Sequence, residues 1–143
     1  MEFKHYNQKQ TILLPYSFDD LIPEQHAVRV VDQIVESINI QPLLKAYNKE
    51  GNPGYHPEIL LKAMLYAYMT NVYSSRKIEL TLHDNINFMW LTSMSIVDHN
   101  TINRFRSNNL KASSKEIFKQ VVLMLTSKGL ITLNQKPNLY RWY

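Results

Sequence analysis

The amino-acid sequence predicts an all-α fold, a compact multi-helix domain with a helix-turn-helix-like unit at about residues 74–109 and a short strand-like tail at 130–134. Apolar residues recur at spacings of three and four in several successive segments, which is the period of an amphipathic helix. Glycine occurs only three times in the chain, and a phosphate-cradling glycine loop would need more glycines and a preceding strand. The strand-like run stands alone, and a single strand has no partner with which to form a sheet.

The chain has 143 residues and contains no cysteine. Its length fits one domain, which we divide into an extended arm at 1–22, a helical domain at 23–134 and a non-matching tail at 135–143. Without cysteine there is no disulfide, no thiolate metal site and no cysteine nucleophile, as is typical of the reducing cytosol. The N-terminus has no apolar signal segment, and no run approaches the ~18 apolar residues that span a bilayer. The sequence therefore predicts a cytoplasmic protein with no membrane partner.

The positive charge of the chain is concentrated in its second half. Residues 1–70 hold 6 basic and 8 acidic side chains, whereas residues 71–143 hold 10 basic and 4 acidic ones. Phosphate contacts supply most of the non-specific affinity of proteins for nucleic acids, so this asymmetry favours a polyanionic partner. A basic half can also serve solubility alone.

Residues 1–22 alternate polar and apolar side chains without a helical period, which predicts an extended arm that docks through its apolar residues. Asp19 and Asp20 are adjacent carboxylates near the end of this arm. A metal or a general-base role is conceivable for them, but acids ahead of a helix more often serve its cap and dipole. We therefore interpret both as structural.

An amphipathic helix is expected from about Glu24 to Ser37, because its apolar residues recur at helical spacing. On its outer face Asp32 and Glu36 could hold a cation, although pairing with Arg29 is the simpler role. A second short helix is expected from roughly Gln41 to Tyr47.

The central helix is expected to begin at Pro57, since proline suits a first helical turn. Ile59 to Met69 is apolar on nearly every side, with Lys62 as its only charge, and a helix that is apolar all round is buried. The surest core positions are Leu60, Leu61, Met64, Leu65 and Tyr68.

The next helix begins with two cations, Arg76 and Lys77, and Ser75 is its expected N-cap. Cations in a first turn oppose the helix dipole at a cost of about 0.3–1 kcal/mol each. A DNA phosphate lying across this helix start would offset the cost, although such cations also occur without function. A short helix at 86–91 and a loop at 92–97 follow, so the order of elements outlines a helix-turn-helix unit with a long turn.

The stretch from Asp98 to Asn108 predicts a helix with Asp98 as N-cap and with Ile102 and Phe105 turned inward. Asparagine pairs with adenine edges and arginine with guanine edges in the major groove, so the polar outer face is a candidate base reader. The alternative is an ordinary solvated amphipathic helix. The predicted base contacts are Asn100, Asn103, Arg104 and Ser107.

The predicted phosphate contacts surround this helix. Arg106 lies only about 40° from Ile102 around the helix, so it could instead pair inside the domain. The phosphate contacts are Ser75, Arg76, Lys77, Arg106 and Lys111.

A last long helix is expected to start at a capping box, with Ser113 as N-cap and Glu116 at the third helical position. Lys115 and Lys119 lie toward its outside, and Gly129 is a natural stop. Its inner stripe is Ile117, Phe118, Val121, Val122 and Leu125.

Five blocks of the sequence, in order, resemble the InsH-type N-terminal helical domain of bacterial insertion-sequence DDE transposases. The resemblance extends over nearly the whole chain, from about Tyr6 to Asn134. It implies a DNA-binding region ahead of a catalytic domain in which three carboxylates hold two metal ions. The blocks are Ile22 to Asp32, Pro57 to Tyr66, Ser74 to Glu79, Phe88 to Thr92 and Asp98 to Arg106.

The chain departs from the family where a strand carrying the first catalytic Asp is expected. Residues 117–143 contain no Asp or Glu, so none of the three metal ligands can be assigned and two-metal chemistry is excluded for this chain alone. We expect a truncated transposase whose DNA-binding domain survives, with no catalytic residue, no metal and no cofactor. An Asp-Gly-Thr-like segment encoded beyond codon 143, in any frame, would test this.

The sequence therefore predicts a non-enzymatic domain that binds double-stranded DNA at element ends and takes no small-molecule substrate. The alternative is a protein-interaction module that pairs with full-length transposase, or with itself, and inhibits it; Tyr140, Trp142 and Tyr143 would suit such a contact. An enzyme in its own right fits least, because the five histidines show no metal-ligand spacing. His99 is of interest because it flanks the predicted reading face.

Overall fold

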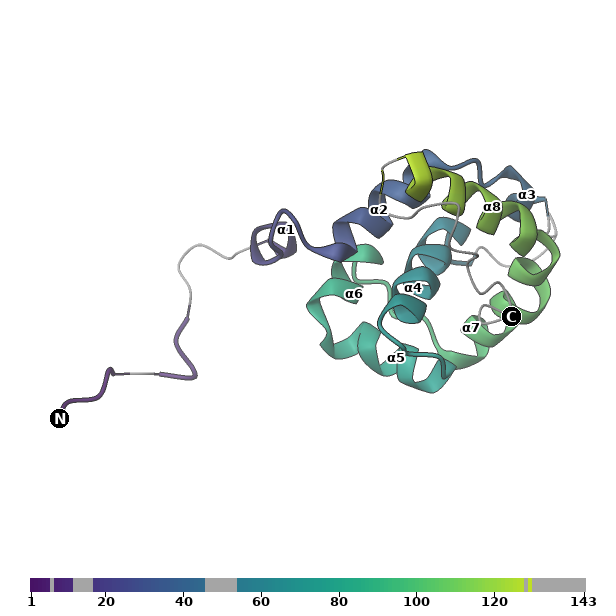
Figure 1. Cartoon of the computed structure of the whole chain (residues 1–143). Helices are drawn as coiled ribbons and strands as arrows, with labels where there is room; N and C mark the ends of the chain where they lie inside the picture. Colours follow the sequence, from purple (N-terminus) through teal and green to yellow (C-terminus); the bar gives the residue numbers. More distant parts are fainter. Residues whose placement is uncertain (6, 12–16, 46–53, 128, 130–143) are drawn as a thin grey trace.

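The computed structural model of the chain describes residues 1–5, 7–11, 17–45, 54–127 and 129 (Figure 1). Within these ranges the regular structure is helical and no residue lies in a strand, which confirms the all-α prediction. The strand-like run predicted at 130–134 and the tail at 135–143 lie outside the described residues. The elements are α1 (Phe18–Leu21), α2 (Ala27–Ser37), α3 (Gln41–Leu44), α4 (Pro57–Met69), α5 (Ser75–Asp84), α6 (Ile86–Leu91), α7 (His99–Arg104), η1 (Phe105–Leu110) and α8 (Lys111–Ser127).

The central position of α4 is confirmed: it contacts α2, α5 and α6, and Figure 1 shows it in the middle of the ring of helices. Leu60, Leu61 and Met64 are buried as predicted, whereas Leu65 and Tyr68 are only partly buried. Ala63, Tyr66 and Ala67 are buried instead. A helix that is apolar on every side carries no periodicity that could distinguish its most buried face.

The arm is not extended throughout. Phe18–Leu21 form the short helix α1, which begins with a capping box between Ser17 and Asp20, in which the Asp20 amide donates to the Ser17 hydroxyl over 3.2 Å. Ile22 then enters the core with 4% of its surface exposed. The apolar docking was predicted, but the helix was not, because four residues are too short to show a period.

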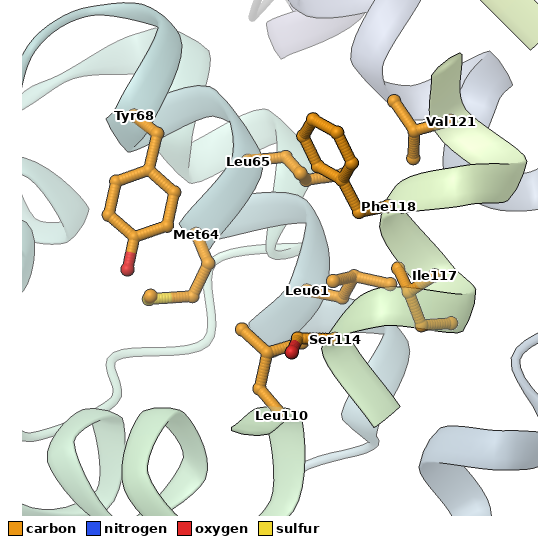
Figure 2. Close-up of a pocket in the computed structure, with 9 residues that line it drawn as sticks. All are labelled: Leu61, Met64, Leu65, Tyr68, Leu110, Ser114, Ile117, Phe118 and Val121. Carbon is orange, nitrogen blue, oxygen red and sulfur yellow. The ribbon is translucent and has the colours of Figure 1, made fainter. Parts of the chain in front are cut away.

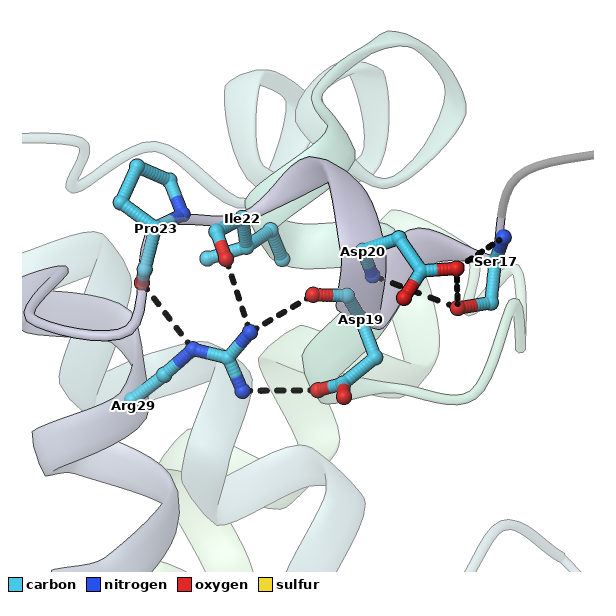
Figure 3. Close-up of polar contacts among 6 residues, drawn as sticks. All are labelled: Ser17, Asp19, Asp20, Ile22, Pro23 and Arg29. Carbon is cyan, nitrogen blue, oxygen red and sulfur yellow. Dashed lines mark hydrogen bonds and ion pairs between the residues drawn. The ribbon is translucent and has the colours of Figure 1, made fainter.

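The arginine of α2 fastens this end of the arm to the domain (Figure 3). The Arg29 guanidinium pairs with the Asp19 carboxylate at 2.7 Å and donates to three backbone carbonyls at 2.7–3.0 Å. It also lies 5.1 Å from the centre of the Trp90 ring. The expected pairing of Arg29 with Asp32 is therefore wrong, because Arg29 turns back toward α1. The carbonyls belong to Asp19, Ile22 and Pro23.

Asp32 and Glu36 pair instead with Lys62 of α4. The Lys62 ammonium lies 2.7 Å from Asp32, 3.3 Å from Glu58 and 3.4 Å from Glu36, and only 8% of the residue is exposed. Burial alone would lower the pKa of Lys62, but the hydrogen bonds and charges of Asp32 and Glu58 outweigh burial and raise that pKa above its ordinary value. The cation that these carboxylates hold is thus a lysine of the same chain.

The predicted break before the last helix does not occur. The chain passes from α7 through the π-helical η1 into α8 without a loop, along one edge of the domain (Figure 1). Ser113 is no N-cap: it is buried inside α8, and its hydroxyl donates to the carbonyl of Asn109 at 3.3 Å. The backbone at Lys111 is already helical, whereas an N-cap needs an extended backbone. The Ser-Ser-Lys-Glu pattern at residues 113–116 therefore does not mark the start of a helix, since α8 already begins at Lys111.

A candidate nucleic-acid interface

The N-cap residue of α5 is Ser74 rather than Ser75, which was predicted. The Ser74 backbone is extended (φ −74°, ψ 132°), and its side chain makes no capping hydrogen bond. Ser75 occupies the first helical position and is nearly buried, with 9% of its surface exposed. Its hydroxyl donates over 2.7 Å to Oδ1 of Asn103 in α7. The serine predicted to cap α5 thus links α5 to α7.

A second polar contact joins the same two helices. Nδ1 of His99 lies 2.9 Å from Oε2 of Glu79. Ser75 and Glu79 are four residues apart on α5, as are His99 and Asn103 on α7, so the two contacts follow one face of each helix and show that the helices run antiparallel. The sequence did not lead us to predict Glu79 as the partner of His99. The equal four-residue spacings of Ser75 and Glu79 on α5 and of His99 and Asn103 on α7 were the signal that could have indicated it.

The outer face of α7 has the predicted form. Ile102 and Phe105 are buried, and Asn100, Asn103 and Arg104 are exposed. Oδ1 of Asn103 accepts the Ser75 hydroxyl with one of its two lone pairs, so the second lone pair and the amide N–H groups remain for another partner. Ser107 is exposed too but lies in η1, where the helical period differs.

Asp98 is the N-cap residue of α7 by its backbone conformation (φ −74°, ψ 158°). Its carboxylate accepts a hydrogen bond from the Thr101 hydroxyl, which is the main reason that the pKa of Asp98 lies below its ordinary value. Asp98 therefore carries a negative charge at neutral pH at the start of α7. On the next turn, a weak contact of 3.5 Å joins the Arg104 guanidinium to the Thr101 hydroxyl.

The cations predicted to contact phosphate differ in their surroundings. Arg76, Lys77 and Lys111 are exposed, and none forms an ion pair with a carboxylate in the described part of the chain. Arg106 instead turns inward: its guanidinium lies 5.7 Å from the centre of the Tyr68 ring. Its Nε is buried and has no hydrogen-bond partner among the described residues. Arg106 therefore packs inside the domain, which was the predicted alternative to a phosphate contact.

The helix order predicted for the helix-turn-helix-like unit is present in α5, α6 and α7. Asn85 caps α6, since its side-chain oxygen accepts from the backbone amide of Asn87 at 2.9 Å. Ser93 and Met94 in the following turn have left-handed backbones, with φ of 51° and 64°. Non-glycine residues in this conformation cost free energy, and here they reverse the chain so that α7 returns against α5.

A separate apolar groove lies between α4 and α8 (Figure 2). Its hydroxyl-bearing residues are Tyr68 and Ser114, and the other side chains are hydrocarbon or thioether. Such a groove can accept an apolar group but offers no charge to a phosphate. The lining residues are Leu61, Met64, Leu65, Tyr68, Leu110, Ser114, Ile117, Phe118 and Val121.

The described residues contain no group of three or more His, Cys, Asp or Glu side chains placed to hold a metal ion. Among them, no helix combines the length and the apolar character needed to cross a bilayer.

A protein-family model described as a transposase domain (DUF772) matches residues 16–108 of the 143-residue chain. The matched stretch contains both helices of the candidate interface, α5 and α7, and ends within η1. No curated protein and no solved structure matches the chain.

Proposed function

The chain belongs to the DUF772 family of transposase domains, and from this premise we propose that it is a DNA-binding domain that recognises the ends of a transposable element. The observation that carries the proposal is the Ser75–Asn103 hydrogen bond of 2.7 Å. It joins the cationic start of α5 to the polar outer face of α7. Phosphate contacts and base contacts are thereby held on adjoining helices.

The start of α5 is the proposed phosphate site. Arg76 and Lys77 are exposed cations in the first turn, where free backbone amides also point out of the helix. The positive end of the helix dipole repels both cations, and a bound phosphate reverses that cost because it attracts the amides and the side chains together. Phosphate contacts of this kind fix the position of a protein on the duplex without reading its sequence.

The outer face of α7 is the proposed reading surface. Arg104 can bind the O6 and N7 acceptors of guanine, and Asn100 can pair with adenine. The Ser75 hydroxyl occupies one acceptor position of Asn103, and the second acceptor position and the amide N–H groups can still pair with adenine. Ser107 has a secondary role at the edge of this surface.

The test uses fluorescence anisotropy of the full chain with two labelled duplexes, one from the ends of the element that encodes it and one scrambled to the same composition. We expect tighter binding to the end duplex and a linear fall of the logarithm of affinity with the logarithm of salt concentration. Equal affinity for both duplexes would contradict recognition of the ends. No binding at low salt would contradict DNA binding altogether.

The apolar groove between α4 and α8 favours a second candidate function, in which the domain pairs with another transposase chain and inhibits it. An apolar contact responds weakly to salt, whereas a phosphate contact weakens steeply as salt rises. Sedimentation of the chain with full-length transposase over the same salt series separates the two functions.

A further inference from the structure

Three lysines of α8 follow one another at intervals of four residues, and we call Lys111, Lys115 and Lys119 the lysine row. All three are exposed, whereas Ile117 on the same helix is buried with 3% of its surface exposed. At 100° per residue, Lys115 and Lys119 each lie about 160° from Ile117 around the helix. The lysine row therefore faces away from the hydrophobic core.

The charge of the lysine row is not neutralised by the described part of the protein. None of its three ammonium groups lies within ion-pair distance of a described carboxylate, and the one acidic residue of α8 is Glu116. Lys62 shows the contrast, since three carboxylates surround its ammonium. Concentrated unpaired positive charge attracts a polyanion, and the affinity for that polyanion falls as the salt concentration rises.

The continuity of the helix places the lysine row relative to the reading surface. α7, η1 and α8 follow one another without a loop, so the exposed lysine row lies on the same continuous run of helix as Asn100 and Arg104. From Arg104 to Lys119 the path is about 22 Å at 1.5 Å per residue. This is about two thirds of the ~34 Å turn of a DNA duplex, so a duplex of one turn or more is long enough to reach both groups of side chains.

Resting on the DNA-binding function proposed above, we infer that the lysine row is a second phosphate-contact surface, which holds the duplex beside the segment that α7 reads. Lysine suits this role because its flexible stem carries a single point charge that needs no fixed geometry. The row contributes affinity and register but no sequence preference, as is general for phosphate contacts. Lys115 and Lys119 thus join Lys111, Arg76 and Lys77 in contacting the DNA backbone.

The experiment compares the wild-type chain with the double variant Lys115→Gln/Lys119→Gln by anisotropy on the end duplex and the scrambled duplex over a salt series. Each lost phosphate contact reduces the slope of log affinity against log salt by about 0.9, so we expect the slope to fall by about 2 on both duplexes. The preference for the end duplex should not change. The matched control is Lys4→Gln/Lys9→Gln, which removes two exposed lysines that precede the family match.

The outcomes separate this inference from the proposed function. If the wild-type chain binds DNA but the Lys115→Gln/Lys119→Gln variant has the same slope of log affinity against log salt, the lysine row does not contact phosphates. DNA binding itself would stand. An equal fall in the control variant would show an effect of net charge, which also overturns the row. If the wild-type chain binds neither duplex, both proposals fall together. Far-UV circular dichroism confirms in each case that the exposed substitutions leave the helices folded.

Discussion

The hydroxyl of Ser75 donates over 2.7 Å to Oδ1 of Asn103 and joins the start of α5 to the outer face of α7. One end of this hydrogen bond is nearly buried and the other is exposed, so the reading face is tied to the core by the side chain that was predicted to cap α5. The bond also orients the Asn103 amide, which leaves its N–H groups directed away from Ser75.

Replacing Ser75 with Ala should lower the free energy of unfolding by about 0.5–1.5 kcal/mol, the usual contribution of one hydrogen bond. It should also reduce the preference for the end duplex, because the Asn103 amide loses its fixed orientation. Urea unfolding and anisotropy measure the two effects. Ser74→Ala is the matched control, since the Ser74 side chain makes no capping bond and its loss should change stability by less than about 0.5 kcal/mol. Equal effects of both substitutions would refute the role given to the Ser75 hydroxyl.

Replacing Arg29 with Ala should release α1 from the domain, because the guanidinium donates to the carbonyls of Asp19, Ile22 and Pro23 and pairs with the Asp19 carboxylate (Figure 3). We expect a loss of about 1–3 kcal/mol in unfolding free energy and faster proteolysis near α1. In the control Asp19→Asn, only the ion pair is lost, and the Asp19 side chain is 65% exposed, so the cost should stay below about 1 kcal/mol. A loss of unfolding free energy above this limit in Asp19→Asn would mean that the ion pair, rather than the hydrogen bonds to the carbonyls, holds α1 against the domain.

The ammonium of Lys62 should stabilise the fold at neutral pH and cease to do so in strong alkali. Its pKa in the folded state is raised above the ordinary 10.5, so the folded state holds the proton more tightly than the unfolded state. That stabilisation is complete below the ordinary pKa and is lost as pH rises through the raised one. Lys62→Met should therefore cost about 1–3 kcal/mol at pH 7, because its partly exposed carboxylate partners lose their cation.

Urea unfolding of both proteins between about pH 7 and pH 11 checks the sign, which follows from the linkage of protonation to folding. Burial raises the pKa of Tyr66 and Tyr68 as well, so the informative quantity is the difference between wild type and variant rather than either curve alone. The difference should shrink in the alkaline range. A difference that stays constant with pH would contradict the ionic role of Lys62.

The helices that the sequence predicts well are those with a long amphipathic period or a long apolar run. α2 and α4 lie within about three residues of their expected starts and end at Ser37 and Met69 as predicted. Ile78 and Leu82, four residues apart on α5, are buried, and so are Ile102 and Phe105, which were predicted to face inward. In each case the burial follows from local apolar spacing, which one helix face determines by itself.

The features that the sequence did not predict depend on contacts between distant residues. Arg29 had a carboxylate three residues away on its own helix, yet its partner is Asp19, because α1 packs against α6 and brings Asp19 to the first turn of α2. Ser113 stood in a capping-box pattern, but the preceding π-helical turn keeps the backbone helical and buries it. Phe105 is buried, and the partly buried Leu110 packs against the same core five residues later, which is the hydrogen-bonding interval of a π-helix. A search for spacings of three and four overlooks this interval.

The most direct test of the proposed interface measures dissociation constants of wild type, Arg104→Ala and Lys77→Ala on the end duplex and the scrambled duplex at one salt concentration. If α7 reads bases and the start of α5 holds phosphates, Arg104→Ala should weaken the end duplex by about 1–3 kcal/mol with little effect on the scrambled one. Lys77→Ala should weaken both duplexes by the same factor. Equal losses on the two duplexes for Arg104→Ala would contradict the assignment of base reading to α7.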